Sequence, residues 1–332
     1  MRKLLLVLLF VFCVVLPTAA QDSPYDAADL ADADGQFMTV DGMRIYYLDR
    51  GSADGRPVIL LHGFLGSVVD WINTIPALTE AGYRVIAFDR PPFGLSDKGT
   101  THDYSIKAMS VLTADVMDAL KIPQAVIVGH SLGGTVAAQF VLDYPERVSQ
   151  LVLVDGAVGL FGSNPQFDMR PNSDGNKNGG NANNGIDFLR RVNPDSPAAQ
   201  LIVHEMFSPD VNKNLMLEAE AKKRSIDAEE QKLRTRGLRV KGWEGGILAF
   251  ARDAFTDKSE IDLDALKTVQ TPVLLVWGQD DPVVSIKVGE SLHDLFPHNR
   301  WITYPDVGHT PMDEVTDQFN ADLVAFIEGK LQ

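Results

Sequence analysis

Cysteine is almost absent from this chain of 332 residues, which carries a single one, Cys13. Because Cys13 lies in a segment that we expect to be removed, the mature protein would have no disulfide, no thiol nucleophile and no cysteine metal site. Basic residues are also scarce, with 30 against 45 acidic ones and a formal charge of −15. This balance argues against a nucleic-acid partner, since phosphate backbones are bound by basic surfaces.

Long apolar runs are missing as well. The longest, residues 4–16, has 13 residues, whereas a membrane-spanning helix needs about 20. The run follows two basic residues and ends at Pro17, before the small residues 18–20, which is typical of a secretory signal. We therefore expect cleavage after residue 20 and a periplasmic or secreted protein. Its charge would change from −15 to −17, because two basic residues and no acidic one are lost. An uncleaved membrane anchor over residues 1–20 is the alternative, and it would be the chain's only membrane contact.

The rest of the chain has the composition of a folded domain, with 45% hydrophobic and 23% charged residues overall. Residues 21–36 are small, acidic and without apolar periodicity, so we expect a flexible tether there. Farther along, short apolar runs alternate with helical patterns, which predicts an α/β fold with a mostly parallel, doubly wound sheet. The predicted strands cover residues 43–48, 58–61, 85–88, 125–128, 148–154, 273–277 and 301–304, and the predicted helices cover 69–80, 105–120, 132–144, 285–295 and 313–329.

The alternation of strands and helices stops over residues 157–250. Ser-Pro pairs at 196–197 and 208–209 predict helix starts within this stretch, because proline fits the first helical position. We expect a helical lid here, inserted into a core formed by residues 37–156 and 251–332.

Three features of the predicted lid bear on function. Residues 172–185 are rich in Asn and Gly, and we hypothesise that they form a hinge or an entrance flap. Apolar residues such as Leu201, Met206 and Phe207 predict an apolar acyl pocket beneath the lid, or simply pack the lid against the core. The charged run 218–236 predicts a helix surface that faces solvent.

Residues 129–134 have the sequence GHSLGG and stand between a predicted strand and a predicted helix. A G-x-S-x-G pattern in this place predicts a sharp turn that holds Ser131 in a strained conformation with its hydroxyl exposed. A side chain at Gly129 or Gly133 would crowd the turn. The free N–H groups at the start of the following helix point to the same place. Ser131 is therefore the candidate nucleophile.

A serine hydroxyl needs a base that is held in place by a third group. His309, between the last predicted strand and the last predicted helix, is the candidate base. Segment 276–282 (VWGQDDP) supplies the candidate acid. Ser131, Asp281 and His309 follow each other in the order expected for a hydrolase with this type of sheet. Because loops after parallel strands emerge at one edge of the sheet, these distant residues can meet there.

Five motifs, in this order, make the chain from about residue 37 to 330 resemble an α/β-hydrolase fold protein with a lid. They are HGFLG at 62–66, DRPPFGLSD at 89–97, GHSLGG at 129–134, WGQDD at 277–281 and GH at 308–309. The resemblance implies a mostly parallel, doubly wound sheet with a helical lid inserted after the sixth strand.

The resemblance also bears on the site residues. In that family the acid normally stands three residues after the glycine of the WG motif, which selects Asp281 and leaves Asp280 and Asp155 as alternatives. The family's oxyanion hole implies that the backbone N–H groups of Phe64 and Leu132 bind the negative charge that develops in the reaction.

Other polar residues of the motifs are expected to be structural. The resemblance implies such a role for Asp89, Arg90 and Asp97. We expect His62 to shape its loop through hydrogen bonds of its ring.

These residues predict hydrolysis of a carboxylic ester with an apolar acyl group through an acyl-enzyme, without a cofactor or a metal. The sharp turn that holds Ser131 is called the nucleophile elbow. Haloalkane dehalogenases and epoxide hydrolases of the family carry aspartate at this elbow, so Ser131 argues against those activities. The alternatives are a carbon–carbon bond hydrolase, a peptidase or a perhydrolase of the same fold, and a catalytically silent binding module.

Overall fold

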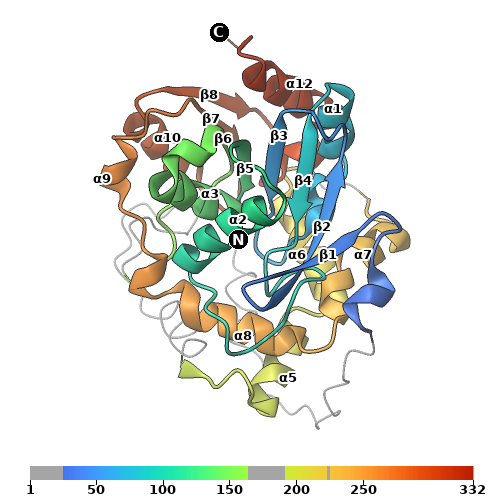
Figure 1. Cartoon of the computed structure of the whole chain (residues 1–332). Coiled ribbons are helices and arrows are strands. Elements are labelled where there is room, and N and C mark those ends of the chain that lie inside the picture. Colours follow the sequence, from blue (N-terminus) through green and yellow to red (C-terminus); the bar gives the residue numbers. More distant parts are fainter. Residues whose placement is uncertain (1–24, 164–190, 223–224, 332) are drawn as a thin grey trace.

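The computed structural model describes residues 25–163, 191–222 and 225–331 (Figure 1). The expected signal segment, the first residues of the expected tether and the stretch 172–185 lie outside the described residues. Within the described residues, no helix combines the length and the apolarity needed to cross a bilayer.

An eight-stranded sheet forms the centre of the molecule, with the strand order β1-β2-β4-β3-β5-β6-β7-β8. β2 pairs antiparallel with both β1 and β4, and all other neighbours are parallel. The predicted α/β fold with a mostly parallel sheet is confirmed. The strands are β1 (Gln36–Val40), β2 (Met43–Arg50), β3 (Pro57–Leu61), β4 (Arg84–Phe88), β5 (Ala125–His130), β6 (Val148–Val154), β7 (Val273–Gly278) and β8 (Asn299–Tyr304).

Side chains of the central strands alternate between two apolar cores, one on each face of the sheet. In β3, Ile59 and Leu61 enter one core and Val58 and Leu60 enter the other, and all four are fully buried. The same alternation explains why these strands read as unbroken apolar runs, since a strand covered on both faces has no polar side.

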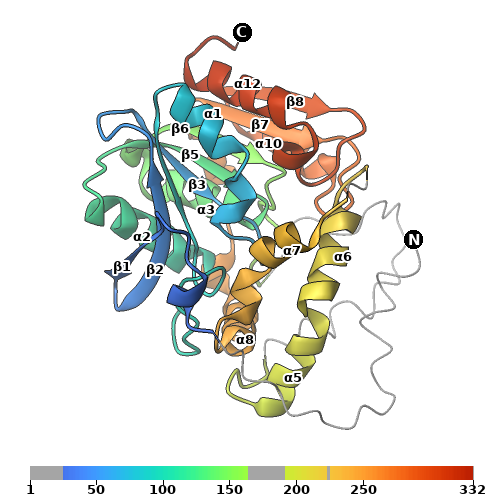
Figure 2. The ribbon, with the colours of Figure 1, turned by 90° about the vertical axis from the view of Figure 1, so that its right-hand side faces the viewer.

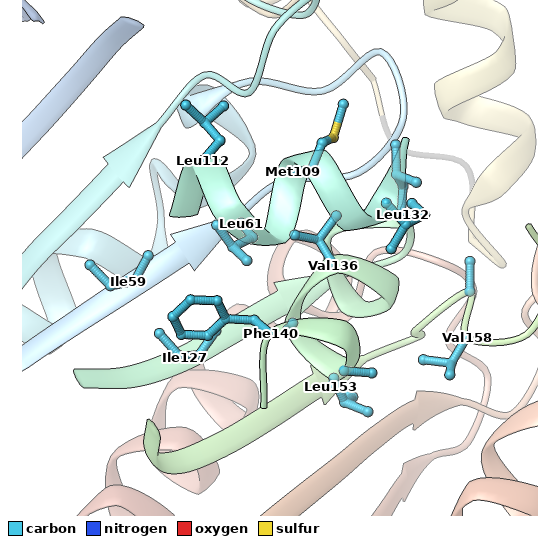
Figure 3. Packing of buried hydrophobic residues seen from close by; sticks show 14 of the residues in the cluster. Ile59, Leu61, Met109, Leu112, Ile127, Leu132, Val136, Phe140, Leu153 and Val158 are labelled. Atoms are coloured by element: carbon cyan, nitrogen blue, oxygen red, sulfur yellow. The ribbon is translucent and has the colours of Figure 1, made fainter. Parts of the chain in front are cut away.

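Helices cover both faces of the sheet (Figures 1 and 2). The first face is covered by α2 (Ile106–Ala119), α3 (Leu132–Asp143) and α10 (Ile286–Leu295), and the second by α1 (Thr74–Glu80) and α12 (Thr316–Ile327). Figure 3 shows the first core, where Val136 and Phe140 of α3 lie against the side chains of β3, β5 and β6. The shorter elements of the core are η2 (Val68–Trp71), η3 (Pro145–Arg147), η5 (Asp257–Ser259), α9 (Leu263–Leu266) and α11 (Pro311–Glu314).

The last predicted helix, 313–329, is in fact two helices. Val315 has a φ of −134° and separates α11 from α12. The carboxylate of Glu314 reaches back to the backbone N–H of Gly308 at 2.9 Å. This contact ties α11 to the loop before it. The periodic pattern of the sequence continues across Val315 and therefore does not reveal the break between the two helices.

The prediction of a flexible tether is wrong for residues 25–36. They form η1 (Ala27–Leu30) and the start of β1. Asp32 accepts hydrogen bonds from Tyr46 Oη at 2.7 Å and from Arg236 Nη2 at 2.8 Å. The acidic residues of this segment therefore pair with residues that are distant in the sequence. The local composition does not reveal such pairs.

The insertion after β6 is helical where the structure describes it. Figure 2 shows its helices grouped together on one side of the core. They are α5 (Pro197–Met206), α6 (Pro209–Ala219), α7 (Ala228–Arg234), η4 (Arg236–Arg239) and α8 (Trp243–Ala254). Helices α5 and α6 begin at the predicted prolines, although neither preceding serine side chain caps its helix. The last helix passes beyond the expected lid boundary at residue 250.

The charged run 218–236 is only partly a solvent-facing surface. Arg234 and Arg236 are buried, with 9% and 3% exposure. Arg234 pairs with Asp313 of α11 at 3.0 Å, and Arg236 pairs with Asp32 at 2.8 Å. The expectation is wrong for these two arginines because each has a carboxylate partner in the core, and the pairs fasten the lid to it.

Candidate active site

Ser131 stands in the turn between β5 and α3. Its φ of 52° and ψ of −119° lie in a region that costs a residue other than glycine about 1–3 kcal/mol. The surrounding backbone holds this conformation. The N–H of Ser131 donates to Val154 O at 2.9 Å, and its carbonyl accepts from the N–H groups of Gly134 and Ala157, both at 2.9 Å. The predicted strained elbow is therefore present.

The two glycines of the elbow are required by close contacts between backbones. A Cβ at Gly129 would collide with the carbonyl oxygen of Gly133, and one at Gly133 would collide with that of Leu61 in β3. Any larger residue would push α3 away from the sheet and move Ser131 with it.

His309 and Asp281 are joined as the sequence predicted. Nδ1 of His309, in the loop after β8, lies 2.8 Å from Oδ2 of Asp281, in the loop after β7. The other oxygen of Asp281 accepts from the N–H groups of Val283 at 2.7 Å and Val284 at 2.9 Å. The Asp281 side chain is fully buried and that of His309 is 8% exposed. With Nδ1 as the donor of this hydrogen bond, Nε2 is the nitrogen that remains for a candidate base.

His309 is brought beside the elbow through its backbone. The carbonyl of His309 accepts a hydrogen bond at 2.8 Å from Nε2 of His130, the neighbour of Ser131. The centroids of the two imidazole rings are 4.8 Å apart. Burial lowers the pKa of His130 to about 3, so this ring stays neutral and serves as a support. Within the described residues, Ser131 Oγ makes no hydrogen bond to His309. Such contacts often tighten only when substrate binds.

The lid also touches the loop that carries His309. The N–H of His309 donates to Ala219 O, at the end of α6, at 2.9 Å. The carboxylate of Glu314 accepts from the N–H groups of Gly308 and of Ala221, both at 2.9 Å. Glu314 therefore holds the histidine loop and the lid together, a role that no motif in the sequence indicated.

The two expected oxyanion donors are both available. Neither Phe64 N–H nor Leu132 N–H donates a hydrogen bond to any of the described residues. Their loops adjoin, because a Cβ placed on Gly63 would lie only 3.3 Å from the Cβ of Ser131. Free, fixed N–H groups next to a candidate nucleophile are what an oxyanion hole requires.

His62 and Arg90 shape the first of these loops, as expected. His62 donates from Nδ1 to Gly63 O at 2.8 Å and accepts at Nε2 from Arg90 N at 2.9 Å. Burial holds the pKa of His62 well below its usual range. The guanidinium of Arg90 bonds to His62 O, and burial lowers its pKa to about 9. Neither side chain is free to react with a substrate.

The acids of the same motif are also structural. Asp89 is fully buried and accepts from Val68 N at 2.7 Å and from Leu95 N at 2.6 Å. Asp97 accepts from Gly99 N at 2.7 Å. Both residues fix turns of the backbone.

An aromatic cluster that we did not predict surrounds Phe64. Its ring centroid lies 5.5 Å from that of Phe93, 5.6 Å from that of Phe250 in α8 and 6.0 Å from that of Phe207 at the end of α5. Phe64 nevertheless keeps 40% of its surface exposed. The cluster gives the oxyanion loop an apolar wall to which both the core and the lid contribute.

The alternative acids differ in their surroundings. Asp280 is exposed, whereas Asp155 is fully buried and accepts from Gly278 N at 3.0 Å. Asp155, Asp281 and His309 place one ligand atom each within 4.8 Å of one another, a spacing that a metal ion could use. Because N–H groups already reach both oxygens of Asp281, we interpret the cluster as a hydrogen-bond network.

Comparisons with known proteins agree with this geometry. A family model for the alpha/beta hydrolase fold matches residues 56–315. The chain is 28% identical to the uncharacterized hydrolase YugF of Bacillus subtilis, over 88% of this chain and 97% of that protein. It is 29% identical to the bifunctional esterase/perhydrolase DCH of Acinetobacter calcoaceticus, over 89% of this chain and all of that protein (100%).

A solved structure gives the same result. A mutant of CumD, a meta-cleavage product hydrolase from Pseudomonas fluorescens, superposes with a TM-score of 0.68 at 27% identity, over 89% of this chain and 98% of that one. Since the family model covers well over half of the sequence, this chain belongs to the α/β-hydrolase fold family and is a hydrolase of that fold.

Proposed function

We propose that this protein is an exported serine hydrolase that cleaves carboxylic esters through an acyl-enzyme. The observation that carries the proposal is the 2.8 Å hydrogen bond between His309 and Asp281. The backbone of His309 is in turn hydrogen-bonded to His130, the neighbour of Ser131. A strained serine, an oriented imidazole and two free N–H donors are the parts that acyl transfer needs.

In the proposed cycle His309 Nε2 takes the proton of Ser131 as Oγ attacks the carbonyl carbon of the ester. Asp281 holds the imidazole and stabilises its positive form. The N–H groups of Phe64 and Leu132 bind the oxyanion, each lowering the barrier by about 3 kcal/mol. The imidazolium returns its proton to the leaving alcohol. Water then attacks the acyl-enzyme with His309 as base, which releases the acid and restores Ser131.

The surroundings of Phe64 support an apolar acyl group. Phe93, Phe207 and Phe250 offer it aromatic surface. The buried arginines are already engaged, since Arg90 bonds to a loop carbonyl and Arg234 pairs with Asp313. A neutral ester therefore suits the described part of the site better than a substrate with a carboxylate near its reacting carbonyl. The similarity to an esterase/perhydrolase points the same way.

A carbon–carbon bond hydrolase is the second candidate, favoured by the structural similarity to a meta-cleavage product hydrolase. A panel of p-nitrophenyl esters of graded acyl length, set against an enol-diketone, separates the two. We expect turnover of the esters with a preference for acyl chains longer than acetate. Turnover of the enol-diketone alone would favour the second candidate.

A fluorophosphonate probe tests the nucleophile directly. We expect the purified protein to be labelled with one probe per chain and the Ser131→Ala variant to remain unlabelled. Ser291→Ala, which changes a serine on α10 far along the chain, is the matched control and should label normally. An unlabelled native protein would favour a binding module. Labelling that persists in Ser131→Ala would mean that a serine other than Ser131 is the nucleophile.

Export is a separate part of the proposal and rests on the sequence of residues 1–20. Expression of the full chain in a bacterium, followed by fractionation and N-terminal sequencing, tests it. We expect periplasmic or secreted protein that begins at Gln21. A full-length chain in the membrane fraction would indicate an uncleaved anchor, and full-length protein in the cytoplasm would contradict export.

A further inference from the structure

A second buried carboxylate stands beside the His309–Asp281 pair. Asp155 follows β6 with a φ of 45°, its N–H donates to Val276 O at 2.9 Å, and its side chain is shut off from solvent. It lies within the cluster whose ligand atoms are no more than 4.8 Å apart. The proposed cycle gives Asp155 no task, so two carboxylates in one buried space need a physical explanation.

The two carboxylates differ in the donors that they receive. Asp281 accepts three hydrogen bonds, two from backbone N–H groups at Oδ1 and one from His309 at Oδ2. Asp155 accepts one, from Gly278 N at Oδ1. Its Oδ2 is buried, and no donor from the described residues reaches it. Three donors are enough to keep Asp281 ionised in a buried site, but one donor leaves a second ion poorly compensated.

A buried oxygen without a donor is satisfied most simply when it carries a proton of its own. Two adjacent buried carboxylates also repel each other unless one of them is neutral. The acid with fewer donors is the one that keeps the proton. We propose that Asp155 is a neutral carboxylic acid whose Oδ2 hydroxyl donates to Asp281, and that it is a positioning residue for the His309–Asp281 pair.

The other groups around Asp155 agree with this assignment. Burial raises the pKa of Asp155 well above its usual range, and the charges of Asp281 and, more weakly, Glu314 raise it further. The N–H of Gly278 acts in the opposite direction. Tyr304 offers no proton to this site, because its hydroxyl donates to Asp322 at 2.8 Å. His309 belongs to the same cluster, and its Nδ1 is already hydrogen-bonded to Asp281.

The consequence for catalysis rests on the proposed function. A hydroxyl donated by Asp155 spreads the charge of Asp281 over a fourth hydrogen bond and fixes the plane of its carboxylate. Asp281 then keeps one fixed orientation as the acceptor for His309 Nδ1, which leaves Nε2 for Ser131. Asp155 therefore acts on the imidazole through Asp281, although it touches neither the substrate nor the imidazole proton.

The test is the pKa of His309 measured by NMR in the whole protein, with the resonance assigned from a His309→Gln sample. Asp155→Asn keeps a donor for Asp281 and an acceptor for Gly278 and adds no charge. Asp155→Leu keeps a similar volume but removes the donor. Asp280→Asn, at an exposed acid one residue from Asp281, controls for a nearby loss of charge.

We expect the His309 pKa of Asp155→Asn to equal that of the unaltered protein, because one neutral donor replaces another. In Asp155→Leu it should rise on the order of 1 pH unit, because Asp281 loses a donor and attracts the imidazolium more strongly. A fall of about 1–3 pH units in Asp155→Asn would mean that Asp155 is ionised, and would overturn the proposal. Identical behaviour of the Asn and Leu variants would overturn it as well.

The NMR titration needs no substrate, so its result is independent of whether esters are turned over. If Asp155→Leu does not fold, the Asn variant alone still decides the charge of Asp155. Where esters are cleaved, the acid limb of kcat/KM against pH should follow the NMR values, and the Asn variant should retain more activity than the Leu variant. If no ester of the panel is cleaved but the His309 titrations come out as expected, the ester function is rejected. The hydrogen bond from a neutral Asp155 to Asp281 is then still supported.

Discussion

The elbow and the lid are attached to the same site by different kinds of contact. Around Ser131 the chain is held by backbone hydrogen bonds and by fully buried apolar side chains such as Val128 and Val136. The lid combines the apolar packing of α8, whose Trp243 and Phe250 lie in the first core, with ion pairs and single polar contacts, among them Arg234 with Asp313 and His309 N with Ala219 O. Apolar packing is lost only when the core unfolds, whereas polar contacts can exchange for water. Helices α6 and α7 bury only Asn212 and Arg234, so we expect them to open more readily than the elbow.

The largest effect is expected from a change to the candidate acid. We expect Asp281→Asn to lower kcat for p-nitrophenyl esters about 10⁴-fold, because the amide favours the wrong tautomer of His309. The melting temperature should change much less than activity. Asp280→Asn is the matched control and should keep activity, since Asp280 is exposed. The opposite ranking of the two variants would mean that Asp280 is the acid.

A second prediction concerns the packing of the elbow helix. Phe140 of α3 is fully buried, and Phe140→Ala should cost about 3–5 kcal/mol of unfolding free energy, measured by urea titration. Phe207→Ala, at the half-buried end of lid helix α5, should cost clearly less and should instead raise KM for long acyl chains. Equal losses of stability would show that the lid and the core unfold as one unit.

A third prediction isolates the lid. Arg234 and Asp313 have side chains only 6% and 5% exposed, so Arg234→Met leaves a buried carboxylate without its partner, at a cost on the order of 3 kcal/mol. We expect this cost to appear as local opening, with faster hydrogen exchange at Ala219–Ala221 and little change at β5. Lys232→Met, on the exposed side of α7, is the control. Faster exchange throughout the core would contradict a separable lid.

The smallest effect concerns pH. Burial raises the pKa of Asp70, at the junction with the lid, to about 7 from the ordinary value of 3.8. The folded protein thus keeps a proton that the unfolded chain releases. The resulting stability is present below about pH 4 and is lost as the pH rises towards 7.

Asp70→Asn cannot ionise, so its melting temperature relative to the unaltered protein should increase between pH 5 and pH 8. The change should be about 2–4 °C for each kcal/mol involved. A difference that stays constant over this range would show that Asp70 titrates normally.

The features that could be predicted from the sequence are local ones. The apolar runs located every parallel strand because both faces of the sheet are covered, and the glycines around Ser131 located the elbow because only they allow its backbone contacts. The loop order placed His309 and Asp281 at one edge of the sheet. β1 was missed because its edge position gives it a mixed pattern.

The features that could not be predicted depend on contacts between distant segments. The pairing of Asp32 could not be predicted, because its partner Arg236 is some two hundred positions away. Phe250 carries no sign in its own helix that it faces Phe64. The sequence indicates Asp155 only as an alternative acid, since its missing donor is visible only once its neighbours are placed.

A rapid-quench experiment with a p-nitrophenyl ester tests the Ser131 acyl-enzyme itself. The proposal predicts a burst of one p-nitrophenol per chain and, in the quenched protein, an acyl group on the peptide that contains Ser131. Steady release of product without a burst, together with an acyl group on a different residue or on none, would contradict a Ser131 acyl-enzyme.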